Sequence, residues 1–331
     1  MQAISEPPRD AELVRFPDRF GPRYILTVDT EEEFDWGAPF TRDRHGLAHV
    51  PALARFQAFC EKSGVVPVYL VDWPIANDPA AIEILKPACA AGRAEVGIQL
   101  HPWVSPPFDE EVTTRNSFAG NLPQPLEREK LTRLRDAIAE NFGLEPRIYR
   151  AGRYGTGSAT ADMLKDLGVR IDTSVRSNFD YSRGGGPDYR KHPLKPYWLE
   201  RDAGLLELPL TTVFWGVLRR QGRQVAPMLG SVPRLGGAAA RLGLLEKIAL
   251  TPEGVSVDEA IRGIDMAIDD GLPILNLSFH SPSLAPGHTP YVRSEDDVEI
   301  LYDWFERVFA YLEMRGVAPT HVDEILHAVA A

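Results

Sequence analysis

The sequence predicts an α/β fold, an irregular (β/α) barrel of about seven parallel strands. Short apolar runs alternate with helical patterns about seven times without a break in composition, and this alternation indicates a parallel sheet covered by helices. No G-x-G-x-x-G opens a helix after the first strand, which argues against a dinucleotide-binding sheet. Parallel barrels carry their active sites at the strand ends. The polar side chains expected at these ends are Asp29, Asp72, His101, Arg150, Asp172 and His280.

Apolar, β-rich runs mark the expected strands, and the spacing of apolar residues marks the helices. The first strand, 24–28, leads into the acidic run R-Y-I-L-T-V-D-T-E-E-E-F-D-W. The other strands are expected at 65–71, 95–100, 147–149, 169–171, 205–208 and 273–279. Helices are expected at 50–63, 79–91, 126–142, 158–167, 257–269 and 296–315. Glycine stops the first four of these helices, at Gly64, Gly92, Gly143 and Gly168.

The chain divides into a lead-in and one domain. Residues 1–20 are polar and contain prolines, so we expect a loosely docked lead-in, followed by a single domain over 21–331. A basic insertion interrupts the domain at about 211–250. Against the single acid Glu246 it carries Arg219, Arg220, Arg223, Arg234, Arg241 and Lys247. The simplest interpretation is a helical lid with a solvated basic face; the alternatives are binding of an anionic saccharide and contact with a membrane surface.

Charge and cysteine content exclude several classes of protein. The net charge of −11 argues against a nucleic-acid surface, which requires a basic field. The two cysteines, Cys60 and Cys89, lack the spacing of a metal motif, and we expect buried free thiols. The first residues resemble no secretory leader, and no run approaches eighteen apolar residues. These observations predict a soluble, cytoplasmic protein.

The strand-end residues are of the types that hydrolytic chemistry uses. Asp29 could act as a general base, held by Arg150, which could in turn pair with Asp172. His101 could bind a divalent metal, and His280 could protonate a leaving amine. Each has a structural alternative: a capping acid, a buried ion pair or a core histidine. Four aromatic residues could stack on sugar rings or simply pack: Trp36, Trp103, Tyr154 and Trp198.

Five segments together resemble, in order, the motifs of the polysaccharide deacetylase family (NodB homology, carbohydrate esterase family 4). They are L-T-V-D-T-E-E, E-V-G-I-Q-L-H-P-W, Y-R-A-G-R-Y-G, the strand end at Asp172, and L-S-F-H-S-P-S-L. The resemblance implies that Asp29 is the general base, that Arg150 orients it and that Asp172 holds this arginine. It further implies that His101 binds the metal and that His280 is the general acid. The runs P-V-Y-L-V-D-W-P and H-S-P-S-L-A-P-G-H-T-P-Y are similar to a divergent branch associated with surface-polysaccharide loci.

The metal motifs depart from the family pattern. Thr30 stands where the family has a second aspartate, so the metal carboxylate would be Glu31 or, as a second choice, Glu32. Only one of two histidines is present, His101, and Gln99 offers no more than a weak carbonyl oxygen. The resemblance implies a divalent cation, zinc by preference, although Glu31 and His101 fall one strong ligand short of a catalytic zinc site. His288, His45, a substrate atom or an extra water would complete it.

The function that the resemblance implies is hydrolysis of an N-acetyl or similar acyl group from a sugar or polysaccharide, with metal-assisted attack by water. Two alternatives remain from the weakened metal motif. One is a metal-independent amidohydrolase of the same fold acting on a small amide. The other is a saccharide-binding relative that has lost catalysis.

Overall fold

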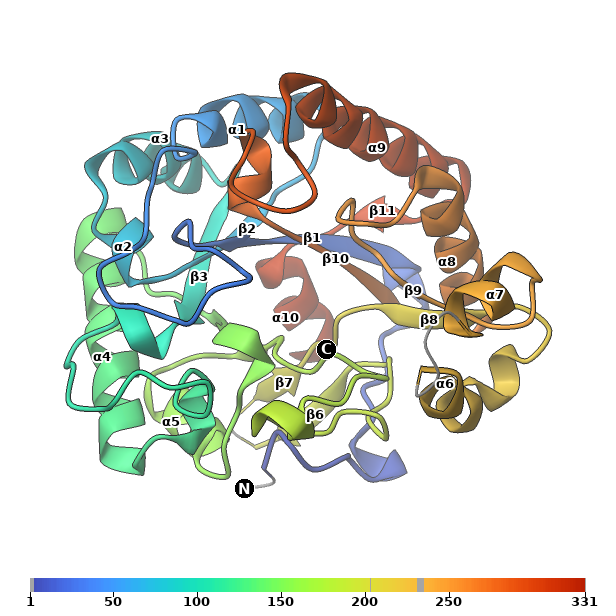
Figure 1. Ribbon diagram of the computed structural model, residues 1–331, viewed down its shortest axis with the longest axis horizontal. Helices are drawn as coiled ribbons and strands as arrows, with labels where there is room; N and C mark the ends of the chain where they lie inside the picture. The colour runs from blue at the N-terminus through green and yellow to red at the C-terminus, as the bar shows by residue number, and fades with distance from the viewer. Residues whose placement is uncertain (1–2, 203, 231–234, 331) are drawn as a thin grey trace.

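The computed structural model describes residues 3–202, 204–230 and 235–330, and its main sheet curls into a half-barrel with helices on the outside (Figure 1). The strand order is β10-β1-β2-β3-β4-β5-β7-β6, and β11 pairs with β1. From β10 to β7 all neighbours run parallel, whereas β6 is antiparallel to β7. The predicted barrel of about seven parallel strands is therefore confirmed. The bounds of the sheet are β1 (Arg23–Thr30), β2 (Val68–Val71), β3 (Glu95–Leu100), β4 (Ile148–Ala151), β5 (Ile171–Asp172), β6 (Tyr197–Glu200), β7 (Leu205–Glu207), β10 (Ile274–His280) and β11 (Ala318–Pro319).

Helices cover the outer face of the sheet (Figure 1). They are α1 (Ala52–Lys62), α2 (Trp73–Ala76), α3 (Pro79–Ala90), α4 (Gln124–Phe142), α5 (Thr160–Asp166), α8 (Val257–Asp269) and α9 (Glu295–Met314). A further helix, α10 (Val322–Ala330), lies at one end of the barrel. Serine capping boxes, which satisfy free backbone N–H groups, begin α8 at Ser256 and α9 at Ser294. Within the described part of the chain, no helix is both long and apolar enough to cross a bilayer.

Strand β1 shows how the sequence divides the two faces of the sheet. Side chains alternate along a strand, so Tyr24, Leu26 and Val28 pack outward beneath the helices. Ile25 packs inward in a second apolar cluster, and Asp29 lies on the same inner face two pleats further toward the mouth. The inner face therefore changes from apolar to charged along the strand, which places the carboxylate at the open end of the barrel.

The other end of the barrel is closed by apolar side chains. Ile25 and its neighbours from the inner faces of the strands pack against Val322 and Ile325 of α10. Figure 1 shows α10 behind the centre of the sheet. The sequence did not predict this helix, because it is short and its ends carry weak signals. Chemistry is thus confined to the mouth formed by the carboxyl ends of the strands.

The N-terminal residues are held more firmly than expected for a loosely docked lead-in. Ile4 is fully buried, and its carbonyl contacts Nε2 of His192 at 3.1 Å. The backbone of Val14 donates to Pro196 O at 2.9 Å. Burial of one large aliphatic side chain contributes about 1.5–3 kcal/mol, so this segment stabilises the domain rather than trailing from it.

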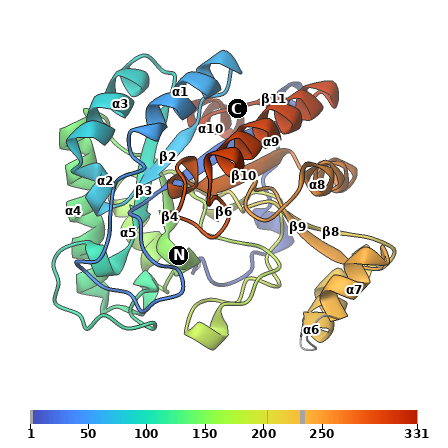
Figure 2. The same cartoon turned by 45° about the horizontal axis from the view of Figure 1, so that its top comes forward.

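The basic insertion forms a hairpin with two helices at its tip. Strands β8 (Thr212–Trp215) and β9 (Glu246–Ala249) pair with each other, and α6 (Gly222–Gly230) and α7 (Leu235–Arg241) lie between them in the chain. Figure 2 shows α6 and α7 standing away from the barrel. Of the basic residues expected here, Arg234 lies outside the described residues. The insertion is therefore an outrigger beside the mouth, and contact with a membrane stays one of the alternatives to a helical lid.

The base of this hairpin covers the free edge of β10. The backbone N–H of Ser278 donates to Leu250 O at 3.1 Å, and that of Thr211 donates to Asn276 O at 3.3 Å. The Asn276 N–H donates to the Thr211 hydroxyl at 2.8 Å. Unpaired strand edges are prone to pairing with other chains, and these bonds occupy the edge where the barrel would otherwise stand open.

Candidate active site

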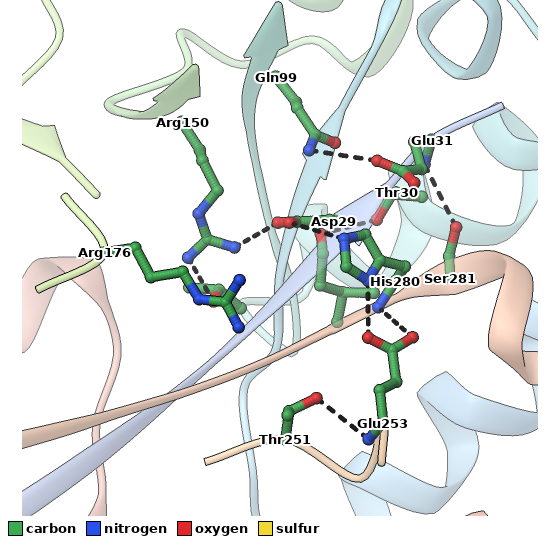
Figure 3. A network of polar contacts seen from close by, with 12 residues as sticks. Asp29, Thr30, Glu31, Gln99, Arg150, Arg176, Thr251, Glu253, His280 and Ser281 are labelled. Carbon is green, nitrogen blue, oxygen red and sulfur yellow. Dashed lines mark hydrogen bonds and ion pairs between the residues drawn. The ribbon is translucent and has the colours of Figure 1, made fainter. Parts of the chain in front are cut away.

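A cavity of about 330 Å³ lies at the mouth of the barrel. Its polar lining comes from segments far apart in the sequence: Asp29, Glu31, Gln99, His101, Glu253 and His280. Figure 3 shows most of these side chains converging above β1. Of the six residues predicted for the site, Asp29, Glu31, His101 and His280 line the cavity, whereas Arg150 and Asp172 lie beneath it.

Arg150 fixes Asp29 from below. Both side chains are buried, and their guanidinium and carboxylate groups form an ion pair (Figure 3). Arg150 also donates to the Thr27 hydroxyl at 2.8 Å and to Thr173 O at 3.1 Å. A charge-assisted bond of this kind sets orientation as well as charge balance. One Asp29 oxygen is thereby occupied, and the other is turned toward the cavity, 3.7 Å from Nε2 of His280.

Asp172 does not hold Arg150 directly, contrary to what the resemblance implied. Among the described residues no hydrogen bond or ion pair joins the two. Asp172 instead accepts from the Ser174 hydroxyl at 2.6 Å and lies in register with Glu207 of the neighbouring strand β7. Burial raises the pKa of Asp172 and raises that of Glu207 well above its usual range, and the nearby Asp172 charge raises the latter further. We therefore infer that the two buried acids share a proton.

His101 is oriented by Glu32, the acid next to the predicted ligand. Its Nδ1 lies 2.8 Å from Glu32 Oε2, and the Trp103 indole donates to Glu32 Oε1 at 2.7 Å. The Glu32 backbone N–H donates to Asp72 at 2.7 Å. With Nδ1–H directed at a carboxylate, as this network assigns it, Nε2 of His101 is the ring nitrogen left to bind a ligand. That nitrogen faces Glu31 Oε2 at 3.4 Å.

The donor pair of Glu31 and His101 fits a divalent cation. Two ligands bound at 2.0–2.1 Å to one tetrahedral zinc lie about 3.3–3.4 Å apart, which matches the 3.4 Å between Glu31 Oε2 and His101 Nε2. Gln99 lies beside them, with Nε2 at 3.4 Å from Glu31 Oε2, and its buried Oε1 has no hydrogen-bond partner. A carboxylate behind a histidine is also the usual support of a metal ligand.

The other candidate ligands do not reach this pair. His45 is exposed, and His288 bonds Glu33 at 3.1 Å. Glu32, Asp72 and His101 bring ligand atoms within 4.8 Å of one another, but the two acids are engaged in the hydrogen bonds above and do not line the cavity. Burial raises the pKa of Glu31 to about 8, and a cation bound at this place would favour its ionised carboxylate.

His280 is held as an imidazolium by acids on two sides. It ends β10 directly beside Asp29, and Nδ1 lies 2.7 Å from Glu253 Oε2 (Figure 3). Burial alone would lower the pKa of His280, but the charges of Glu253 and Glu31 outweigh it and raise the pKa to about 10. No sequence pattern pointed to Glu253, which lies in the turn between β9 and α8. His280 is thus a proton donor at neutral pH.

Aromatic rings form one wall of the cavity. Trp36, Trp103 and Tyr154 line it as expected, together with Phe34 and Phe40. Trp36 packs edge-on to the His280 ring with 4.9 Å between centroids and is 36% exposed, which leaves part of its face for a ligand. Trp198 lies on β6 and does not line this cavity. The wall suits a sugar ring, whose apolar face stacks on aromatic side chains.

Comparison with solved structures shows which proteins share this fold. A Mycobacterium smegmatis protein provisionally described as a polysaccharide deacetylase matches 98% of this chain and 94% of its own, with 20% identity and a TM-score of 0.54. The resemblance to polysaccharide deacetylases is thus confirmed at the level of the fold. No family model matches the sequence, and no curated protein does.

The same fold also occurs in glycoside hydrolase family 57 branching enzymes. That of Thermococcus kodakaraensis matches over 93% of this chain and 71% of its own at 15% identity, with a TM-score of 0.50. That of Pyrococcus horikoshii matches over 93% of this chain and 70% of its own at 12% identity, with a TM-score of 0.51. Folds host several chemistries, so the choice between them rests on the residues of the site.

Proposed function

We propose that this protein is a hydrolase of the polysaccharide deacetylase type, which removes an N-acetyl or similar acyl group from a sugar. The observation that supports it is the pairing of an arginine-held carboxylate, Asp29, with an imidazolium, His280, beside the donor pair Glu31 and His101. Amide hydrolysis requires a base for water and an acid for the departing amine. Both stand on one cavity, 3.7 Å apart.

In this proposal each residue has one task. Asp29 accepts the proton of the attacking water, and Arg150 aims its carboxylate. His280 donates the proton on Nε2 to the amine as the C–N bond breaks, while Glu253 stabilises the charged ring. Glu31 and His101 would hold a divalent ion, zinc by preference, which supplies a more acidic water and polarises the acyl carbonyl.

The alternatives make different demands on the site. Glycoside chemistry typically uses two carboxyl groups as acid and base or nucleophile, whereas here the proton donor is a histidine and Asp29 is engaged with Arg150. A metal-independent amidohydrolase would use Asp29 and His280 without the donor pair. A saccharide-binding relative would use only the aromatic wall. It would not need Asp29, His280 or the donor pair of Glu31 and His101.

The test is release of acetate from N-acetylated oligosaccharides, comparing the native protein with Asp29→Asn. General-base loss typically costs 10²–10⁴-fold, and we expect kcat to fall by about this much. Asp35→Asn is the matched control, because Asp35 belongs to the same acidic run but is exposed. Unfolding curves of both variants separate loss of chemistry from loss of fold.

Chelation separates the remaining possibilities. Activity that is lost with a chelator and restored by Zn²⁺ supports the proposal. Activity that survives chelation points to the metal-independent hydrolase. Saccharide binding without acetate release from any substrate points to the non-catalytic relative, and an Asp29→Asn variant as active as Asp35→Asn removes Asp29 from the mechanism.

A further inference from the structure

Two arginines line the catalytic cavity without an acidic partner. They are Arg153 and Arg176, and no described Asp or Glu lies within 4.0 Å of either guanidinium. Arg176 stacks over Phe179 with 3.9 Å to the ring centroid, and it donates to the Tyr181 hydroxyl at 3.3 Å. Figure 3 shows its side chain extending from the Arg150 side of the site toward His280. Its charge is therefore supported by aromatic faces and directed at the space that a substrate would fill.

Arg153 is presented by a strained turn. Arg153 and Tyr154 both adopt left-handed backbone, with φ of 53° and 60°, which costs about 1–2 kcal/mol per non-glycine residue. The Arg153 guanidinium lies over Phe118 at 4.2 Å and over Phe40 at 4.9 Å. This turn places the side chain at the cavity wall, where the guanidinium also donates to the Ser117 hydroxyl.

The positive charge continues out of the cavity toward the insertion. The Lys247 ammonium lies 3.5 Å from the centroid of Phe179, the ring that Arg176 also contacts. Burial and the nearby Arg176 lower the pKa of Lys247 to about 8. Lys247 and Arg223 line an adjoining groove of about 630 Å³. We call Arg153, Arg176, Lys247 and Arg223 the cationic track.

This arrangement is unusual in an acidic chain. The net charge is −11, and many arginines elsewhere on the surface are paired with acids, for example Arg55 with Glu299 and Arg133 with Glu129. Neighbouring positive charges repel one another, and burial together with the nearby Arg176 lowers the pKa of Lys247. Cation–π contacts stabilise each charge singly, but they do not remove this repulsion. An anionic ligand does.

We propose that the saccharide substrate is acidic, and that Arg176, flanked by Arg153 and Lys247, binds its anionic group, a carboxylate or a phosphate ester. The acylated sugar then faces Asp29 and His280 while the charged group lies at the start of the cationic track. This inference rests on the proposed function and adds the class of substrate to it. The planar guanidinium group presents two parallel N–H donors, which can bind either a carboxylate or a phosphate in a bidentate manner.

The test is calorimetric binding of two matched probe pairs to the native protein at low salt. The first pair is a hyaluronan tetrasaccharide and its methyl ester, which differ only in carboxylate charge. The second is N-acetylglucosamine 6-phosphate and N-acetylglucosamine. We expect the charged member of at least one pair to bind about tenfold or more tightly than its neutral partner, and the pair that responds identifies the anion. Higher salt should reduce the difference.

Substitution then locates the effect. Arg176→Gln should weaken the charged probe about tenfold or more and leave the neutral one unchanged. Arg133→Gln, which removes the same charge from the exposed face of α4, should change neither. Equal binding within both pairs, no binding of either charged probe, or a charge preference that survives Arg176→Gln would overturn the inference. Because binding and acetate release are measured separately, a charge preference without acetate release would refute the proposed function alone.

Discussion

The carboxylate of Glu253 helps to keep His280 protonated, and the Glu253→Gln variant should show how far it raises the pKa of His280. The carboxylate lies 2.7 Å from Nδ1, and the pKa of His280 is about 10 against an ordinary 6.5, although burial alone would lower it. A hydrogen bond to a charged partner contributes about 1.5–3 kcal/mol, and one pKa unit corresponds to about 1.4 kcal/mol. Loss of the carboxylate should therefore lower the pKa of His280 by about one to two units, with Glu31 and Asp29 sustaining the rest.

The shift can be measured by NMR titration of the histidine rings in metal-free protein, with His280 assigned from a His280→Asn variant. In the active protein the alkaline limb of kcat/KM against pH should move to lower pH, because the imidazolium is lost sooner. Glu299→Gln makes the same chemical change on the exposed face of α9 and should shift neither. A His280 pKa that moves by less than about half a unit would refute the assignment of Glu253.

Two further predictions concern the residues beneath the cavity. The folded protein keeps a proton on the Asp172–Glu207 pair that the unfolded chain releases above a pKa of about 4.5, so its stability falls by about 1.4 kcal/mol per pH unit above that value. The amide of Glu207→Gln does not titrate, so this variant should lose less stability as the pH rises. In urea unfolding, its free energy of unfolding relative to that of the native protein should increase by about 2 kcal/mol between pH 5.5 and pH 7. If this relative stability is the same at both pH values, the two acids do not share a proton. An added Cβ at Gly152 would lie 2.4 Å from His101 Cδ2, whereas one at Gly236 meets nothing within 4 Å. Gly152→Ala should therefore weaken Zn²⁺ binding, measured by chelator competition, about tenfold or more relative to Gly236→Ala, and equal affinities would place the ion elsewhere.

Most of the barrel was predictable because its signals are local. The strand expected at 95–100 and the helix expected at 257–269 agree with β3 and α8, since apolar spacing and end signals define both. Strand β6 was missed because it runs antiparallel at the edge of the sheet, where pairing with β7 rather than a buried apolar run defines it. Helices α6 and α7 contain Pro227 and a pair of glycines, which disfavour a helix by propensity.

The site was predictable where a residue follows directly from a strand. Asp29, His101 and His280 lie at the ends of β1, β3 and β10, so the topology alone brings them together. Glu253 lies in a turn and Arg176 in an isolated bridge to Leu210. Both positions depend on tertiary packing, and nothing local marks them. Asp172 has the expected position but a different partner, because the neighbouring strand supplies Glu207, which the sequence pattern could not align with it.

The bonds from Thr211 and Leu250 to β10 determine how the outrigger can be trimmed. Val213 and Ile248 face each other across the hairpin. Replacing the residues between them with a short turn would remove α6 and α7 and leave the bonds of Thr211 and Leu250 to β10 in place. Excision of 211–250 as a block would instead bare the backbone of β10 and invite edge-to-edge association between molecules. The first and last residues of the insertion are therefore part of the barrel wall, whereas its tip is not.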